Sequence, residues 1–276
     1  MIPLRGRELV IGYAFLAAGI LAIVVPFLFI LATSFKYEIA IMQGRFLFEP
    51  TWLNYANVLF GRRSNFIGNI GNSLIVATVS TILVLVIGTL AAYSLSRMKW
   101  ARWISATFLG WTVIFNTVPI LTVVGPWYLM FQQIGLYNTL TALVLTHVAI
   151  NLPMTVWLMM TFFRDIPVEL EEAARVDGAG RAQAFRRVIL PLAVPGLIAA
   201  GVLAFVFSWN EFTIALNLTS RTTATVPVGI ANFAEQFEVQ NGNMAAASVL
   251  STIPALILMI FGQRFVVQGL TMGAVK

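Results

Sequence analysis

Six long apolar runs alternate with shorter polar segments along this chain. As a helix, each run is long enough to cross a bilayer core of about 30 Å at about 1.5 Å per residue. The pattern therefore predicts a membrane protein with six spanning helices. We place the spans at residues 9–33, 72–96, 103–131, 140–163, 192–218 and 245–267.

Two of these runs need comment. The first follows Arg5 and Arg7, and a signal peptide would have a shorter apolar core of about 7 to 15 residues, so we interpret the run as a retained span. The third contains Pro119 and Pro126. Prolines free backbone groups that only protein or cavity water can satisfy, so we expect this segment inside the bundle.

The composition agrees with a membrane protein. The chain is 59% hydrophobic and 10% charged, with a mean hydropathy of +0.88. These charges are too few to coat a soluble domain of 276 residues, so most of the surface must face lipid. We interpret residues 1–276 as a single transmembrane domain. The absence of cysteine excludes disulfides and thiolate metal sites, and we expect no metal site.

Basic residues are unequally divided between the two sides of the predicted spans. Twelve lie on the side of the two termini and of loop 164–191, and five lie on the other side. Because basic loops stay in the cytoplasm, we predict a multi-pass protein of the plasma (inner) membrane with both termini cytoplasmic. These loops account for the net charge of +6, so no nucleic-acid partner is needed.

The segment at residues 164–191 holds ten charged side chains, in a chain with 17 basic and 11 acidic residues. Pro167 suits a first helical turn, carboxylates follow where the helix dipole favours them, and Gly178 suits a helix stop. We predict a short helix with Glu171 and Arg175 paired at i, i+4, then a turn and a second, basic helix. An amphipathic loop on lipid headgroups is the alternative, but an acidic helix with an alanine face favours a protein socket.

The same segment resembles the EAA loop of ABC-importer permeases. That loop reads Glu-Ala-Ala, three residues, Gly, nine residues, Ile, one residue, Leu-Pro. The chain follows the pattern with one change, Val for Ile, at Glu172, Ala173, Ala174, Gly178, Val188, Leu190 and Pro191.

Three further strings look like the carbohydrate-uptake branch of these permeases. They are Ala91–Arg97, Trp209–Phe212 and Gly269–Lys276. With them the resemblance covers nearly the whole chain, and it is most similar to the shorter permease partner of maltose- and trehalose-type transporters.

The resemblance implies an all-α fold, that of a type I ABC importer (MetI-like) permease with a cytoplasmic coupling helix. It implies the permease subunit of an ATP-driven sugar importer, forming half of the translocation pathway in a heterodimer with a second permease subunit. The other implied partners are two ABC ATPase subunits, which would hold ATP and Mg²⁺, and an extracytoplasmic solute-binding protein. The implied ATPase-coupling residues are Glu169, Glu172, Ala173, Ala174, Asp177 and Gly178.

Enzyme motifs are absent from the sequence. The chain has no G-x-x-x-x-G-K-[ST] phosphate loop, no H-E-x-x-H, no G-x-S-x-G and a single histidine. We therefore expect no catalytic residue and no cofactor in this chain, with ATP hydrolysis by separate subunits.

Polar residues inside spans are usually functional. His147 and Asn151 are spaced i, i+4 and share a helix face, which either lines a cavity or bonds neighbouring helices. Asn116 has the same two interpretations. We predict that all three belong to the substrate pathway.

Glu211 is a carboxylate in an apolar run, which is costly unless it is paired, protonated or wet. With Trp209 and Asn210 it offers the aromatic face and hydrogen-bonding groups of a sugar site, so we add all three to the predicted pathway. A structural pair with Arg221, or a gate, is the other interpretation. The alternative functions are a proton-coupled secondary transporter using Glu211 and His147, and a membrane scaffold without transport.

Overall fold

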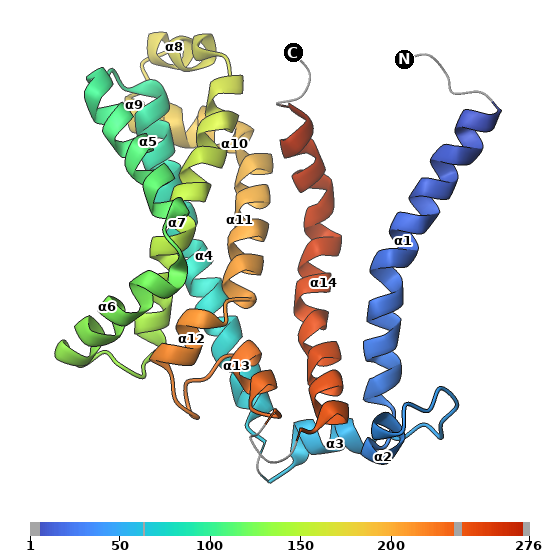
Figure 1. The fold of residues 1–276 in the computed structure, drawn as a ribbon. Helices are drawn as coiled ribbons and strands as arrows, with labels where there is room; N and C mark the ends of the chain where they lie inside the picture. The colour runs from blue at the N-terminus through green and yellow to red at the C-terminus, as the bar shows by residue number, and fades with distance from the viewer. Residues whose placement is uncertain (1–5, 63, 235–238, 273–276) are drawn as a thin grey trace. The chain divides into compact units, whose positions relative to one another are not determined.

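The computed structural model describes residues 6–62, 64–234 and 239–272 and confirms the all-α architecture (Figure 1). Within these ranges the elements are helices, apart from a single bridge between Ala234 and Val239. Among the described residues, four helices are long and apolar enough to cross a membrane, and two bent helix pairs raise the total to six if each pair is one span. The four are α1 (Arg7–Ser34), α4 (Phe66–Arg97), α7 (Leu140–Asp165) and α14 (Asn241–Met272).

One bent pair replaces the run predicted at residues 103–131. Here α5 (Arg102–Thr117) and α6 (Ile120–Gln133) meet at 98°. Val118 and Pro119 between them have extended backbones, because proline lacks the N–H of a helical turn and disfavours helix in the residue before it. Pro126, by contrast, lies inside α6 and does not end it.

The run predicted at residues 192–218 is also not one helix. A first arm, residues 181–192, meets the helix Val194–Trp209 at 72°. Three residues then separate Trp209 from a further short helix that begins at Thr213. The basic helix predicted after Gly178 is therefore the first arm, which contains a π-helical turn. The elements are α9 (Arg181–Ala184), η1 (Phe185–Ile189), α10 (Leu190–Leu192), α11 (Val194–Trp209) and α12 (Thr213–Leu218).

The chain divides into two compact units. The first unit comprises residues 1–66 and 229–253, and the second comprises residues 67–228 and 254–276. The remaining short helices are α2 (Glu38–Met42), α3 (Leu53–Phe60), α8 (Val168–Val176) and α13 (Val226–Ala231).

Polar caps hold the first unit together. Glu38 accepts hydrogen bonds from the backbone N–H groups of Asn241 (3.2 Å) and Gly242 (3.1 Å), at the start of α14, where the helix dipole favours a carboxylate. Asn54 of α3 donates to the carbonyl oxygen of Ser34 at 2.9 Å. The loop between α1 and α4 is thus fastened to the ends of two long helices.

In the second unit, α4, α7 and α11 lie side by side (Figure 1). Small residues allow the close approach: Gly88 of α4 faces Thr155 of α7, and Gly196 of α11 faces the ring of Phe162 on α7. Helices in lipid associate largely through such close packing, because lipid is as apolar as their side chains.

Gly196 gives a direct test of this packing. A Cβ at this position would lie 2.4 Å from the Phe162 ring, so Gly196→Ala forces α7 and α11 apart and we expect it to lower stability by about 1–3 kcal/mol. The measurement is the Tm of the detergent-solubilised protein. Gly110→Ala on α5 is the matched control, since a Cβ there meets nothing within 4 Å. An unchanged Tm for Gly196→Ala would contradict the packing.

Candidate functional site

The predicted coupling helix is α8, which lies across the end of the second unit (Figure 1). Pro167 precedes it with an extended backbone, and Gly178 follows it with φ +86°, a conformation that glycine adopts without strain. Both helix boundaries agree with the sequence prediction. No residue of α8 is buried, so the rest of the chain leaves most of its surface open.

The residues predicted to couple to an ATPase gather on and just beyond this helix. Five of them are exposed and Ala174 is half-buried; the five are Glu169, Glu172, Ala173, Asp177 and Gly178. Three apolar side chains of α8 are also exposed, Val168 at 48%, Leu170 at 42% and Val176 at 87%. The open surface of α8 therefore combines acidic and apolar side chains.

Glu171 differs from its neighbours because it points into the protein. The phenol of Tyr93, on α4, donates to its Oε1 at 2.7 Å, and Nε of Arg97 lies 3.9 Å from its Oε2. The predicted pair with Arg175 is wrong, because the carboxylate turns toward these two α4 groups instead. Neither Tyr93 nor Arg97 was predicted as a site residue, although both lie in the Ala91–Arg97 string.

Arg97 also reaches the end of α7. Its Nη2 donates to the carbonyl oxygen of Phe163 at 2.8 Å and to that of Ile166. These carbonyls belong to the last turn and cap of α7, where the helix dipole favours a cation. One guanidinium thus joins the ends of α4 and α7 to α8.

A second polar cluster crosses the bundle at His147, which is fully buried. Its Nδ1 lies 2.6 Å from Oγ of Ser208 on α11, and that hydroxyl lies 3.1 Å from Oγ of Ser80 on α4. Nε2 of His147 lies 3.6 Å from Oε2 of Glu211. The cluster therefore connects α4, α7, α11 and the start of α12.

Glu211 caps α12. Its Oε1 accepts from the backbone N–H of Ile214 at 2.8 Å and its Oε2 from that of Ala215 at 3.0 Å, and both of these residues are fully buried. A carboxylate at a helix start satisfies donors that have no partner within the helix. The break after Trp209 thus creates the place that Glu211 fills.

The other predicted pathway residues differ in how far they are buried. Asn151 is buried and donates to the carbonyl oxygen of His147, and Trp209 is buried and stacks on Phe205 at 5.9 Å. Asn210 is exposed beside the break and donates to the carbonyl oxygen of Val206. Asn116 lies near the end of α5, and its side chain is outside the described part of the structure.

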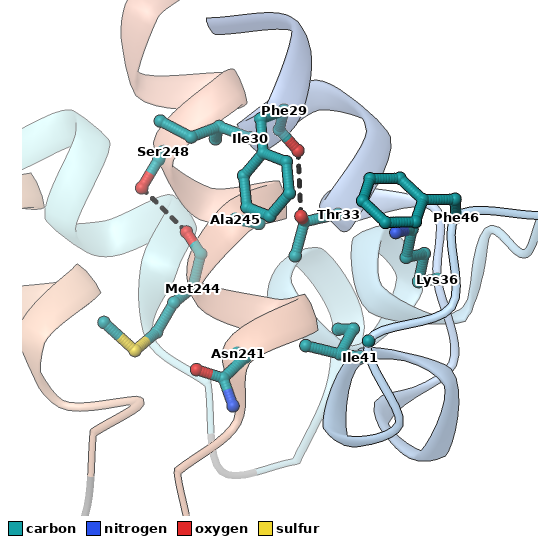
Figure 2. Close-up of a pocket in the computed structure, with 11 residues that line it drawn as sticks. Phe29, Ile30, Thr33, Lys36, Ile41, Phe46, Asn241, Met244, Ala245 and Ser248 are labelled. Carbon is teal, nitrogen blue, oxygen red and sulfur yellow. Dashed lines mark hydrogen bonds between the residues drawn. The ribbon is translucent and has the colours of Figure 1, made fainter. Parts of the chain in front are cut away.

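A hollow of about 440 Å³ opens in the first unit, between α1, α2 and the start of α14 (Figure 2). The hydroxyls of Thr33 and Ser248 donate to carbonyls of their own helices, and the Lys36 ammonium donates to the carbonyl of Arg45 and lies over the Phe48 ring. The polar groups that line the hollow thus have partners within the protein, and none of the predicted pathway residues lines the hollow. The lining residues are Phe29, Ile30, Thr33, Lys36, Ile41, Gly44, Phe46, Asn241, Met244, Ala245 and Ser248.

The described residues contain no group of three or more His, Cys, Asp or Glu side chains that could hold a metal ion. The two polar clusters are built from hydrogen bonds between helices, with the carboxylate of Glu171 close to Arg97 in one and that of Glu211 close to His147 in the other. One joins α8 to the bundle, and the other fixes the break between α11 and α12.

Helices long and apolar enough to span a membrane, together with an exposed short helix at one end of the second unit, fit the predicted class of membrane permease. The chain belongs to the family of binding-protein-dependent transport system inner membrane components, whose model matches residues 84–272. The family predicted from the coupling-loop pattern is thereby confirmed.

Individual proteins agree with this family. The chain is 36% identical over 272 residues to the trehalose transport system permease protein SugB of Mycobacterium tuberculosis, covering 97% of this chain and 94% of that protein. It is 35% identical over 255 residues to the trehalose/maltose transport system permease protein MalG of Thermococcus litoralis, covering 91% of each.

A solved structure shares the fold. A chain of a bacterial ABC transporter involved in the import of the acidic polysaccharide alginate superposes with a TM-score of 0.80, at 22% identity, over 95% of this chain and 99% of that one. The predicted type I importer permease fold is therefore confirmed.

Proposed function

We propose that this chain is the permease subunit of an ATP-driven sugar importer and forms half of its translocation pathway. The observation that supports this proposal most directly is the exposure of α8. This helix has acidic and apolar side chains, none of its residues is buried, and its sequence matches the coupling-loop pattern. The names of the relatives, which transport trehalose or maltose, support a sugar as the substrate. Neither the family nor these relatives support the proton-coupled alternative.

The proposed assembly pairs the chain with a second permease subunit, two ABC ATPase subunits and an extracytoplasmic solute-binding protein. ATP and Mg²⁺ belong to the ATPase subunits, because this chain has no phosphate loop. We assign no catalysis to the chain itself. The distribution of basic residues supports an inner-membrane topology with both termini and α8 on the cytoplasmic side.

In the proposed mechanism α8 sits in a socket of an ATPase subunit. Glu169, Glu172 and Asp177 offer carboxylates to basic or polar socket groups, Ala173 and Ala174 allow close approach, and Gly178 sets the following turn. Closure of the ATPase dimer carries α8 with its socket. Because α8 follows α7 directly and leads into the arm before α11, its movement turns these two helices and opens the translocation pathway outward.

Among the predicted pathway residues, Asn210 is the one we propose to meet the sugar. Its side chain is exposed beside the break between α11 and α12. We propose that His147, Asn151, Trp209 and Glu211 do not contact the sugar. Their buried contacts fix the position of the break between α11 and α12, where Asn210 lies. Asn116 remains a pathway proposal from the sequence.

The first experiment is a pull-down of the detergent-solubilised chain from its own membranes, with the copurifying proteins identified by mass spectrometry. We expect the wild type to recover an ABC ATPase. With Glu172→Ala, which removes a charged hydrogen-bonding group from the docking surface, we expect the amount of recovered ATPase to fall by about tenfold or more. Glu49→Ala, which removes an exposed carboxylate outside α8, is the matched control and should recover the ATPase fully.

The two ways of failing are distinct. Equal recovery with Glu172→Ala and wild type would show that α8 does not dock through this residue. Absence of an ATPase with every form, under mild detergent conditions, would remove the support for the importer itself.

A further inference from the structure

Glu171 fastens α8 to the end of α4. Its side chain is 12% exposed, whereas every other residue of α8 is exposed except Ala174, which is half-buried and has no polar side chain. A docking residue must be accessible to its partner subunit. Glu171 is turned the other way, so its role differs from that of Glu169 and Glu172.

Its two partners lie one turn apart at the end of α4. Tyr93 donates a hydrogen bond of 2.7 Å, and Arg97, with a side chain 8% exposed, supplies the opposite charge at 3.9 Å. A hydrogen bond to a charged acceptor is about twice as strong as a neutral one. Away from water, an ion pair is also weakly screened. The hydrogen bond from Tyr93 connects α8 to a residue that lies 78 positions earlier in the sequence.

Both partners are themselves held by other helices. The Tyr93 ring packs against Phe163 of α7, with centroids 5.8 Å apart, and against Phe185 of η1 at 4.5 Å. Arg97 donates to the carbonyl oxygens that end α7. A displacement of Glu171 therefore cannot occur without moving α4, α7 or η1, or breaking a charged hydrogen bond.

We propose that Tyr93, Glu171 and Arg97 form an internal link that passes the movement of α8 to α4, with Glu171 as a positioning residue that does not touch the ATPase. This inference rests on the proposed docking of α8 to an ATPase. It adds a second route of transmission, since the backbone connects α8 to α7 and to the arm before α11 but not to α4. Through the link, α4 turns together with the two helices beside it.

The test uses the purified complex of the chain with its ATPase. The chain has no cysteine, so spin labels can be placed at Leu90→Cys, 53% exposed on α4, and Arg175→Cys, exposed on α8. The distance between the labels is measured by pulsed electron paramagnetic resonance without nucleotide and after trapping with ATP and vanadate. With the link intact, we expect the same narrow distribution in both states.

Two variants break the link in different ways. Glu171→Gln removes the charge, and Tyr93→Phe removes only the donated hydrogen bond and leaves the ring packing in place. In both variants we expect the ATPase to copurify as with the wild type. On trapping, we expect the mean distance between the labels to change by about 2 Å or more, or the distance distribution to broaden. The matched controls are Glu49→Gln and Tyr13→Phe, exposed residues outside the link, which should keep the wild-type distances.

Two results would overturn the inference. Wild-type distances in both states for Tyr93→Phe would show that the link carries no movement. Loss of the ATPase from Glu171→Gln, with the protein still folded, would make Glu171 a docking residue. If Glu171→Gln does not fold, Tyr93→Phe decides alone. A wild type that recovers no ATPase would instead contradict the proposed function, before the link is tested.

Discussion

Replacing Gly178 by proline is expected to abolish transport while leaving membrane insertion intact. Gly178 has φ +86°, and proline is restricted to φ near −65°, so the backbone that ends α8 cannot form. The docking carboxylates would then point in new directions. The measurement is ATP-driven uptake of radiolabelled sugar into vesicles that hold the whole transporter, together with the amount of the variant in the membrane.

Two substitutions separate backbone conformation from other effects at this turn. Gly178→Asn should retain most transport, because asparagine tolerates positive φ and a Cβ at this position meets nothing within 4 Å. Gly180→Ala should be close to wild type, since Gly180 has φ −67° and open space around it. Normal uptake by Gly178→Pro would show that the shape of this turn does not matter for coupling.

Replacing Glu211 by alanine is expected to lower the stability of the protein by roughly 2 to 4 kcal/mol. The change leaves the buried backbone N–H groups of Ile214 and Ala215 without their acceptor and takes the carboxylate away from His147. Transport should fall with stability. The measurement is the Tm of the purified protein in detergent, beside uptake in vesicles.

Asn210→Ala is the companion variant. Its side chain is exposed and donates to a carbonyl oxygen of its own helix, so its loss should leave the Tm close to wild type while sugar uptake falls. The two variants distinguish a residue that stabilises the fold from one that contacts the sugar. A Glu211→Ala protein with a wild-type Tm and no uptake would place Glu211 in contact with the sugar.

Features that depend on neighbouring residues were predictable from the sequence. The spans at residues 9–33, 72–96 and 140–163 lie inside α1, α4 and α7, because a bilayer demands about 20 apolar residues whatever they pack against. The boundaries of α8 followed from Pro167 and Gly178, whose backbone preferences act locally.

Two features could not be read from hydropathy or helix spacing. The run at residues 192–218 is apolar enough on average for one span, so its hydropathy does not reveal that Glu211 within it supplies acceptors for a new helix start. The predicted pair of Glu171 with Arg175 used helix spacing alone. The actual partners lie on α4, more than 70 positions earlier in the chain, where no local pattern indicates them.

The long helices differ in how much of each is buried by its own chain, and this bears on how the protein enters the bilayer. More than half of the most apolar stretch of α7 is buried, and it is the least apolar of the four single spans, whereas that of α1 is not buried at all. A nascent segment partitions into lipid according to its apolarity. We therefore expect α1 and α4 to insert unaided as they emerge, and α7, with His147 and Asn151 inside it, to remain at the translocon until α11 is synthesised.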